Sequence, residues 1–166
     1  AAITPMHIDG SIDLLAWERL LNSFIHAEVA GVVVLGTTGE SVNISMPERA
    51  ELLRIAAKVL KVTEWLVGVG HASMATALDL ARQAQAYEPT GLMVVTPYYN
   101  RPMTDGLVKY FQEFLEQIQM PIIAYNVPSR TGIDVGVEVW DELYGHRLFV
   151  GIKEAHSAVE RANYYR

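Results

Sequence analysis

The chain has 166 residues, 51% of them hydrophobic, which is enough to bury a sizeable core within one domain. Its formal net charge of −6, spread along the sequence, argues against a nucleic acid or an anionic membrane as partner. Cysteine is absent, which excludes disulfides, thiolate catalysis and cysteine-ligated zinc. No apolar run approaches the ~18 residues that a membrane span requires, so we expect a soluble, cytoplasmic protein.

Short apolar runs recur about every thirty residues, which is the spacing of repeated βα units. They are continuously apolar, as in strands of a parallel sheet that helices cover on both faces. A fragmentary run of this kind stands at the N-terminus. We therefore predict strands at Ala1–Thr4, Gly31–Leu35, Trp65–Gly68, Gly91–Val95, Pro121–Tyr125 and Leu148–Ile152.

The stretches between these runs show helical spacing, and the second is the best marked. Ser45 and Glu48 form a capping box, Pro47 stands in the first turn, and apolar residues from Leu52 to Leu60 share one face. Further helices are predicted at Leu14–Glu28, Ser73–Tyr87, Asp105–Ile118 and Gly136–Leu143, and the end of the chain at Asn163–Arg166 also has helical character. The result is six βα units in tandem.

A series of βα units can form an open doubly wound sheet or a closed (β/α)₈ (TIM) barrel. Polar or glycine-rich clusters follow nearly every predicted strand, whereas a doubly wound sheet would concentrate them at one switch point. We therefore predict the barrel. Six units do not close a barrel of about 250 residues, so we expect residues 1–166 to be an incomplete catalytic barrel that lacks its C-terminal units.

The segment Gly36–Ser41 carries two glycines around the hydroxyls of Thr37 and Thr38, and such a loop can bind an anion. An ordinary βα turn is the alternative. A P-loop is excluded because no lysine follows Gly39, and the later glycines do not form a dinucleotide fingerprint because Ser73 occupies the third glycine position.

Lys153 stands at the end of the last predicted strand, and Gly151, two residues earlier on the same face, leaves space beside it. A lysine at a strand end is ordinarily solvated. If the side chain points inward, desolvation lowers its pKa and provides the neutral amine that attacks carbonyl groups.

Tyr125 and Tyr99 follow two other predicted strands, and hydroxyls in series can pass a proton. Thr38, Tyr125 and Tyr99 could form such a relay, although strand-end tyrosines are often structural. Arg130 lies in a loop and could bind a substrate carboxylate, or it could be solvated. His71 and His156 are isolated histidines, and we interpret neither as a metal ligand.

Four segments together resemble the dihydrodipicolinate synthase and N-acetylneuraminate lyase family, and their order and spacing agree with it. They are Gly36–Ser41, Val95–Pro102, Tyr125–Gly132 and Gly151–Ala155. The resemblance implies a homotetrameric lyase, built from dimers, of lysine and diaminopimelate biosynthesis. Such an enzyme condenses pyruvate with L-aspartate-4-semialdehyde and needs no metal or organic cofactor.

The resemblance also implies a role for each matching residue. Lys153 matches the Schiff-base lysine, and Thr38, Tyr125 and Tyr99 match the proton relay, with Tyr99 reaching into a neighbouring subunit. The loop at Gly36, Thr37 and Thr38 matches the one that holds the pyruvate carboxylate. Arg130 matches the residue that receives the carboxylate of the aldehyde substrate.

The chain departs from the family pattern in three places. His156–Ala158 replaces a small hydroxyl residue, glycine and aspartate beside the site. Regulated members of the family bind L-lysine as a feedback inhibitor. Of the residues that form their lysine pocket, Ser41 and Tyr98 remain in this chain, but the others are replaced. We therefore expect weak or no inhibition by L-lysine. The replacements are Met46, Arg49, Ala72 and Thr76. We also expect the family's C-terminal barrel units and helical domain to be missing from these 166 residues.

Two alternatives remain open. The altered loop at His156 favours another pyruvate-dependent aldolase of the family, of the N-acetylneuraminate lyase or keto-acid aldolase type. The chain could also be a truncated module without catalytic activity.

Overall fold

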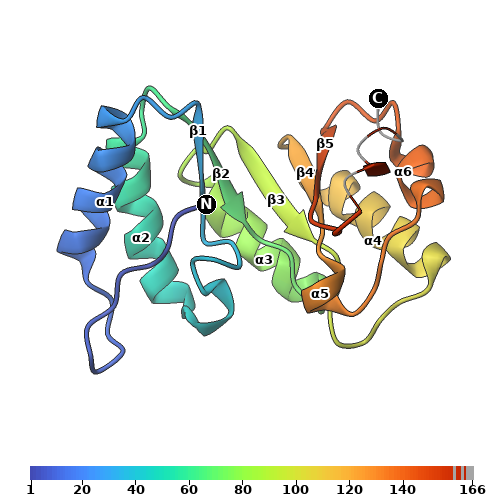
Figure 1. Cartoon of the computed structure of the whole chain (residues 1–166), viewed down its shortest axis with the longest axis horizontal. Helices are drawn as coiled ribbons and strands as arrows, with labels where there is room; N and C mark the ends of the chain where they lie inside the picture. The colour runs from blue at the N-terminus through green and yellow to red at the C-terminus, as the bar shows by residue number, and fades with distance from the viewer. Residues whose placement is uncertain (159, 162, 164–166) are drawn as a thin grey trace. The chain divides into compact units, whose positions relative to one another are not determined.

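The computed structural model describes residues 1–158, 160, 161 and 163. Within this part of the chain, five strands alternate with helices (Figure 1). The chain divides into two compact units. Unit 1 comprises Ala1–Gly68 and Arg82–Gly91, and unit 2 comprises Val69–Ala81 and Leu92–Arg166.

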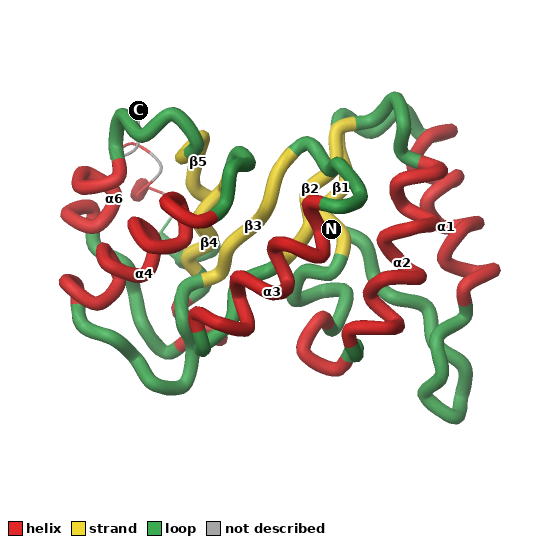
Figure 2. Tube along the Cα trace, turned by 180° about the vertical axis from the view of Figure 1, so that it is seen from behind, coloured by secondary structure: helices red, strands yellow, loops and turns green. Residues whose placement is uncertain are grey.

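Unit 1 contains two strands that pair in parallel, with Gly31 opposite Glu64 at one end and Val34 opposite Val67 at the other. Helices α1 and α2 pack against each other, as Figures 1 and 2 both show. The elements of this unit are α1 (Leu14–His26), β1 (Gly31–Val34), the 3₁₀ helix η1 (Ser41–Asn43), α2 (Met46–Val59) and β2 (Glu64–Gly68).

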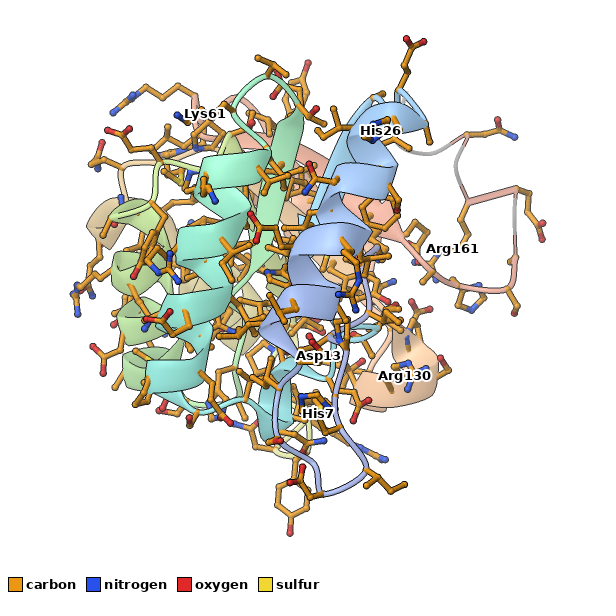
Figure 3. All side chains as sticks on the ribbon, turned by 90° about the vertical axis from the view of Figure 1, so that its left-hand side faces the viewer. His7, Asp13, His26, Lys61, Arg130 and Arg161 are labelled. Atoms are coloured by element: carbon orange, nitrogen blue, oxygen red, sulfur yellow. The ribbon has the colours of Figure 1, made fainter. Side chains whose placement is uncertain are left out.

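Side chains fix where the two helices of unit 1 begin. Asp13 accepts a hydrogen bond from the Ala16 N–H at 2.8 Å and caps α1, whose other end is at His26 (Figure 3). The predicted capping box of α2 is present, because Ser45 and Glu48 each accept a hydrogen bond from the other's backbone N–H. These bonds satisfy backbone donors that a helix start otherwise leaves unpaired.

Unit 2 contains three parallel strands, in which β4 lies between β3 and β5. Helices α4 and α6 pack against each other (Figures 1 and 2). The elements are β3 (Gly91–Val95), α4 (Thr104–Gln117), β4 (Ile122–Asn126), α5 (Pro128–Thr131), α6 (Val137–Leu143) and β5 (Phe149–Glu154). Helix α3 (Met74–Gln85) begins in unit 2 and ends in unit 1.

The core of unit 2 is aromatic where α4, α6 and β5 meet. The Trp140 ring lies edge-on to Phe111 at 5.6 Å between centroids and is stacked on Phe149 at 6.1 Å. Phe111 and Trp140 are almost fully buried. Aromatic contacts of this kind add stabilisation beyond the area that they bury.

The predicted helices and strands agree with the structure to within two residues at their ends, with the following differences. The run Ala1–Thr4 is not a strand, although the Ala2 N–H donates to the Val33 carbonyl of β1. The last strand extends through Glu154, so Lys153 lies inside β5 and not beyond its end. The loop that carries Arg130 contains the short helix α5. The predicted helical ending at Asn163–Arg166 lies, from residue 164 on, outside the described residues.

The described residues include no helix that is both long enough and apolar enough to span a membrane.

Candidate active site

Lys153 and Tyr125 lie side by side on neighbouring strands of unit 2. The parallel register pairs the two residues, and the Lys153 Nζ stands 4.1 Å from the centroid of the Tyr125 ring. Tyr125 is 6% exposed, and Lys153 is partly buried. Burial lowers the pKa of Lys153 below the ordinary value of 10.5, because a low-dielectric environment disfavours the ammonium form.

The backbone of β5 leaves room next to this pair. Gly151 precedes Lys153 by two residues, so the two share a face of the strand. A side chain built at Gly151 would meet nothing within 4 Å. The space that the sequence predicted beside the lysine is therefore present in unit 2.

The side chain of Asn126, the last residue of β4, joins the end of β4 to the end of β5. Its amide nitrogen donates to both carboxylate oxygens of Glu154, at 3.0 and 3.1 Å, and to Asp134 at 3.0 Å. Its amide oxygen accepts from the Val135 N–H at 3.3 Å, and its backbone carbonyl accepts from Ala155 at 2.9 Å. Sequence reasoning assigned no role to Asn126, although it directly follows Tyr125.

The carboxylates around Asn126 also contact basic side chains. Arg161 bonds to Asp134 and to the Val135 carbonyl, and it lies 3.8 Å from Glu154. His156 places Nε2 3.9 Å from Asp134. Desolvation alone would raise the pKa of Asp134, but the hydrogen bonds from Asn126 and Arg161, together with the nearby charge of Arg161, leave the pKa lowered.

Tyr99 and Arg130 line one hollow of unit 2, with a volume of about 520 Å³. Both side chains are exposed, and Figure 3 shows Arg130 projecting from α5. A second arginine, Arg101, lies against Gly132, where a Cβ would come within 2.7 Å of its guanidinium. The full lining is Tyr98, Tyr99, Arg101, Ser129, Arg130, Thr131 and Gly132.

The hollow is cationic, since no carboxylate is paired with Arg101 or Arg130 in the part of the chain that the structure describes. Two guanidinium groups can bind a carboxylate through charge-assisted hydrogen bonds. Sequence reasoning assigned no role to Arg101. Its place in the segment Val95–Pro102, which resembles the family, was the signal that could have identified it.

The loop with Gly36, Thr37 and Thr38 belongs to unit 1. Gly36 is buried and its carbonyl accepts from the N–H groups of Gly39 and Ser41, at 3.1 and 3.4 Å. This tight turn leaves both threonines exposed. The Thr4 hydroxyl donates to the Gly39 carbonyl at 2.8 Å and secures the loop to the N-terminal segment. The structure thus presents the threonines in one unit and Lys153, Tyr125, Tyr99 and Arg130 in the other.

His71 and His156 each take part in a local hydrogen bond. The His71 Nδ1 accepts from the Ser73 N–H at 3.0 Å, and its ring lies edge-on to Tyr98. The His156 Nδ1 accepts from the Ala158 N–H at 2.9 Å. Among the described residues, no three His, Cys, Asp or Glu side chains are grouped as metal ligands would be.

Arg49 matches a position of the family's lysine-binding pocket, and its side chain is buried in this structure. It is 1% exposed, and its guanidinium donates to the Gly68 carbonyl at 3.0 Å. Burial lowers its pKa to about 10. The reason is its place on α2, because Arg49 shares the apolar face with Leu52 and Ala56 and so points into unit 1.

Comparison with known proteins agrees with the features above. The chain is 39% identical over 163 residues to 4-hydroxy-tetrahydrodipicolinate synthase of Methanococcoides burtonii, covering 98% of the chain and 56% of that protein. It is 43% identical over 162 residues to the synthase of Xanthomonas axonopodis pv. citri, covering 97% of the chain and 54% of the relative. The chain thus spans about half the length of the curated relatives that it matches.

Solved structures give the same result. A crystal structure of the synthase from Acinetobacter baumannii complexed with pyruvate matches with a TM-score of 0.95 at 33% identity, covering 99% of the chain and 57% of that protein. These relatives are barrels, so the fold is part of a (β/α)₈ barrel, as the sequence predicted. The profile of the dihydrodipicolinate synthetase family matches residues 1–166, and the chain belongs to that family.

Proposed function

We propose that the complete protein carrying this chain condenses pyruvate with L-aspartate-4-semialdehyde to 4-hydroxy-tetrahydrodipicolinate. The observation that carries the proposal is the partly buried amine of Lys153, with a lowered pKa, beside the Tyr125 ring. A lysine that loses its proton readily is a nucleophile toward ketones. The pyruvate bound to a relative's crystal structure supports this choice of ketone.

In the proposed reaction, the Lys153 amine attacks the keto carbon of pyruvate, and the keto oxygen leaves as water. Loss of a methyl proton from the imine gives an enamine, whose carbon attacks the aldehyde. The amino group of the second substrate then displaces Lys153 from the imine carbon and closes the ring. One water molecule is released overall, and no metal or organic cofactor takes part.

The other residues have proposed roles in the same reaction. The Tyr125 hydroxyl moves protons at the imine, in series with Thr38 and with Tyr99 of a neighbouring subunit. The loop at Gly36 and Thr37 holds the pyruvate carboxylate. We assign residues 1–166 to an incomplete barrel of a cytoplasmic homotetramer built from dimers.

Arg130 receives the carboxylate of the semialdehyde in this proposal. The cationic hollow supports that role, because Arg130 is exposed and lies beside Tyr99. A guanidinium in such a position can bind both carboxylate oxygens.

Borohydride reduction in the presence of pyruvate tests the proposal. The complete protein should gain the mass of one reduced pyruvyl group at Lys153. The Lys153→Arg variant should gain none, while Lys109→Arg, which changes an exposed lysine of α4, should react like the parent protein. An unmodified Lys153 would reject the proposal and favour a binding module without catalytic activity.

The departure of His156–Ala158 from the family pattern favours a second candidate, another pyruvate-dependent aldolase. In that segment the backbone N–H of His156 donates to the Glu154 carboxylate at 2.9 Å. Such an enzyme would also trap pyruvate at Lys153, so turnover must decide. Faster cleavage of N-acetylneuraminate or of sugar keto acids than condensation of the semialdehyde would favour this candidate.

A further inference from the structure

The side chain of Asn126 is buried at the ends of β4 and β5, and both its amide nitrogen and its amide oxygen are hydrogen-bonded. Asn126 is 0% exposed, and its amide nitrogen bonds to Asp134 and to both oxygens of Glu154. Its amide oxygen accepts from Val135. A buried amide with partners on both of its ends holds its neighbours in one arrangement, since each lost bond leaves a polar group unsatisfied.

The register connects this amide to the proposed catalytic pair. Tyr125 is opposite Lys153, and Asn126 is opposite Glu154, one residue further along both strands. Successive side chains in a strand point to opposite faces. The link from Asn126 to Glu154 therefore lies on the other face of the two strands from the Lys153 amine and joins their last residues.

The chemistry at this position requires an amide. Asp134 and Glu154 both place a carboxylate about 3 Å from the Asn126 nitrogen, so a donor must stand between them. An aspartate here would bring a third carboxylate into the cluster and could not donate. Arg161 contacts both carboxylates from another side and supplies the opposing charge.

We propose that Asn126 is a positioning residue, whose amide fixes the ends of β4 and β5 and so holds the Lys153 amine over the Tyr125 ring. The inference rests on the proposed function of Lys153. If the strand ends separate, Lys153 becomes more exposed to water, and water then stabilises its ammonium form. The direct consequence is a less reactive amine at neutral pH.

The test measures the amine itself, without a substrate. Trace labelling with acetic anhydride over a range of pH, followed by mass spectrometry, gives the pKa of Lys153 in the complete protein. The Asn126→Asp variant should raise that pKa, and labelling of Lys153 near neutral pH should fall by about tenfold for each unit of increase.

Two further variants separate positioning from general damage. Asn43→Asp is the matched control, because it removes an exposed hydrogen bond from an asparagine amide to the carboxylate of Glu40 in unit 1. It should leave the labelling of Lys153 unchanged. The double variant Asn126→Asp with Glu154→Gln places the carboxylate at position 126 and the amide donor at position 154, so the net charge is unchanged. It should recover a substantial part of the lost reactivity. Asn126→Ala, which adds no charge, should also raise the pKa of Lys153, and it provides the measurement if the aspartate variant does not fold.

The results distinguish this inference from the proposed function. A variant that melts at a lower temperature but keeps the Lys153 pKa of the parent protein would overturn the positioning role, and so would a double variant without recovery. If Asn126→Asp shifts the pKa while the parent protein fails to trap pyruvate, the positioning role stands and the proposed function fails.

Discussion

The Lys153 amine faces the ring of Tyr125 across the β4–β5 ladder, with 4.1 Å between Nζ and the ring centroid. Two effects oppose each other there. The ring face attracts an ammonium group, whereas burial disfavours it, and burial lowers the pKa of Lys153. The tyrosine thus has two separable parts, a ring that contacts the amine and a hydroxyl that can transfer protons.

Replacement of Tyr125 by phenylalanine separates these parts, because the ring remains and the hydroxyl is lost. We expect pyruvate still to be trapped at Lys153, while kcat falls by roughly 10²- to 10⁴-fold, the range for loss of a proton-transfer group. Steady-state turnover and borohydride trapping measure the two effects. Tyr144→Phe, at a tyrosine that is 88% exposed, should change neither. Full turnover by Tyr125→Phe would remove its hydroxyl from the mechanism.

The rate of imine formation should depend on pH through Lys153. Since only the neutral amine attacks pyruvate, the rate should rise with pH and level off above the pKa of this lysine. Burial lowers that pKa, so the inflection of the rate profile should lie below the 10.5 of an ordinary lysine. Single-turnover trapping, with an N-acetyl-lysine amide as reference, measures the profile. An inflection at or above that of the reference would contradict the structure.

The Arg130→Ala variant should raise the KM for L-aspartate-4-semialdehyde and leave pyruvate trapping unchanged. A hydrogen bond to a charged group is worth about 1.5–3 kcal/mol, which corresponds to roughly a ten- to hundredfold change. Arg147→Ala is a matched control, because it removes an exposed arginine of the same unit that bonds only to Gln119 among the described residues. Equal effects of the two variants would exclude a specific role for Arg130.

Two buried tryptophans differ in hydrogen bonding, so comparing them measures how much one buried hydrogen bond contributes to the free energy of unfolding. The Trp17 Nε1 donates to the Leu52 carbonyl at 3.0 Å, whereas the Trp140 Nε1 has no partner in the described part of the chain. We expect Trp17→Phe to lower the free energy of unfolding by about 1 kcal/mol more than Trp140→Phe does. Urea unfolding followed by circular dichroism tests this, and a larger loss for Trp140→Phe would contradict it.

L-lysine should inhibit the complete protein weakly or not at all. Free lysine needs acceptors for its two amino groups and donors for its carboxylate. Met46 and Ala72 offer none of these, and Arg49 is bound to the Gly68 carbonyl. Turnover titrated with L-lysine measures the effect, and strong inhibition at submillimolar lysine would show that other groups form the pocket.

Local signals predicted much of the fold and placed Lys153 and Tyr125 at strand ends, while the register that pairs the two was not predicted. The start of α2 was predicted because Ser45, Pro47 and Glu48 act within one turn. The cluster around Asn126 was not predicted, because Glu154 lies 28 residues away and only the strand register brings it near. The burial of Arg49 was not predicted, although its spacing from Leu52 and Ala56 places it on the buried face of α2.

Strand β5 has a consequence for work with the isolated 166-residue polypeptide. Within the described residues β5 pairs with β4 alone, and Val150 on it is 58% exposed, whereas β4 is largely buried. A strand with one free edge offers unpaired N–H and C=O groups on which another chain can align. Concentrated solutions of this polypeptide should therefore self-associate, and a lysine in place of Val150 should delay the turbidity.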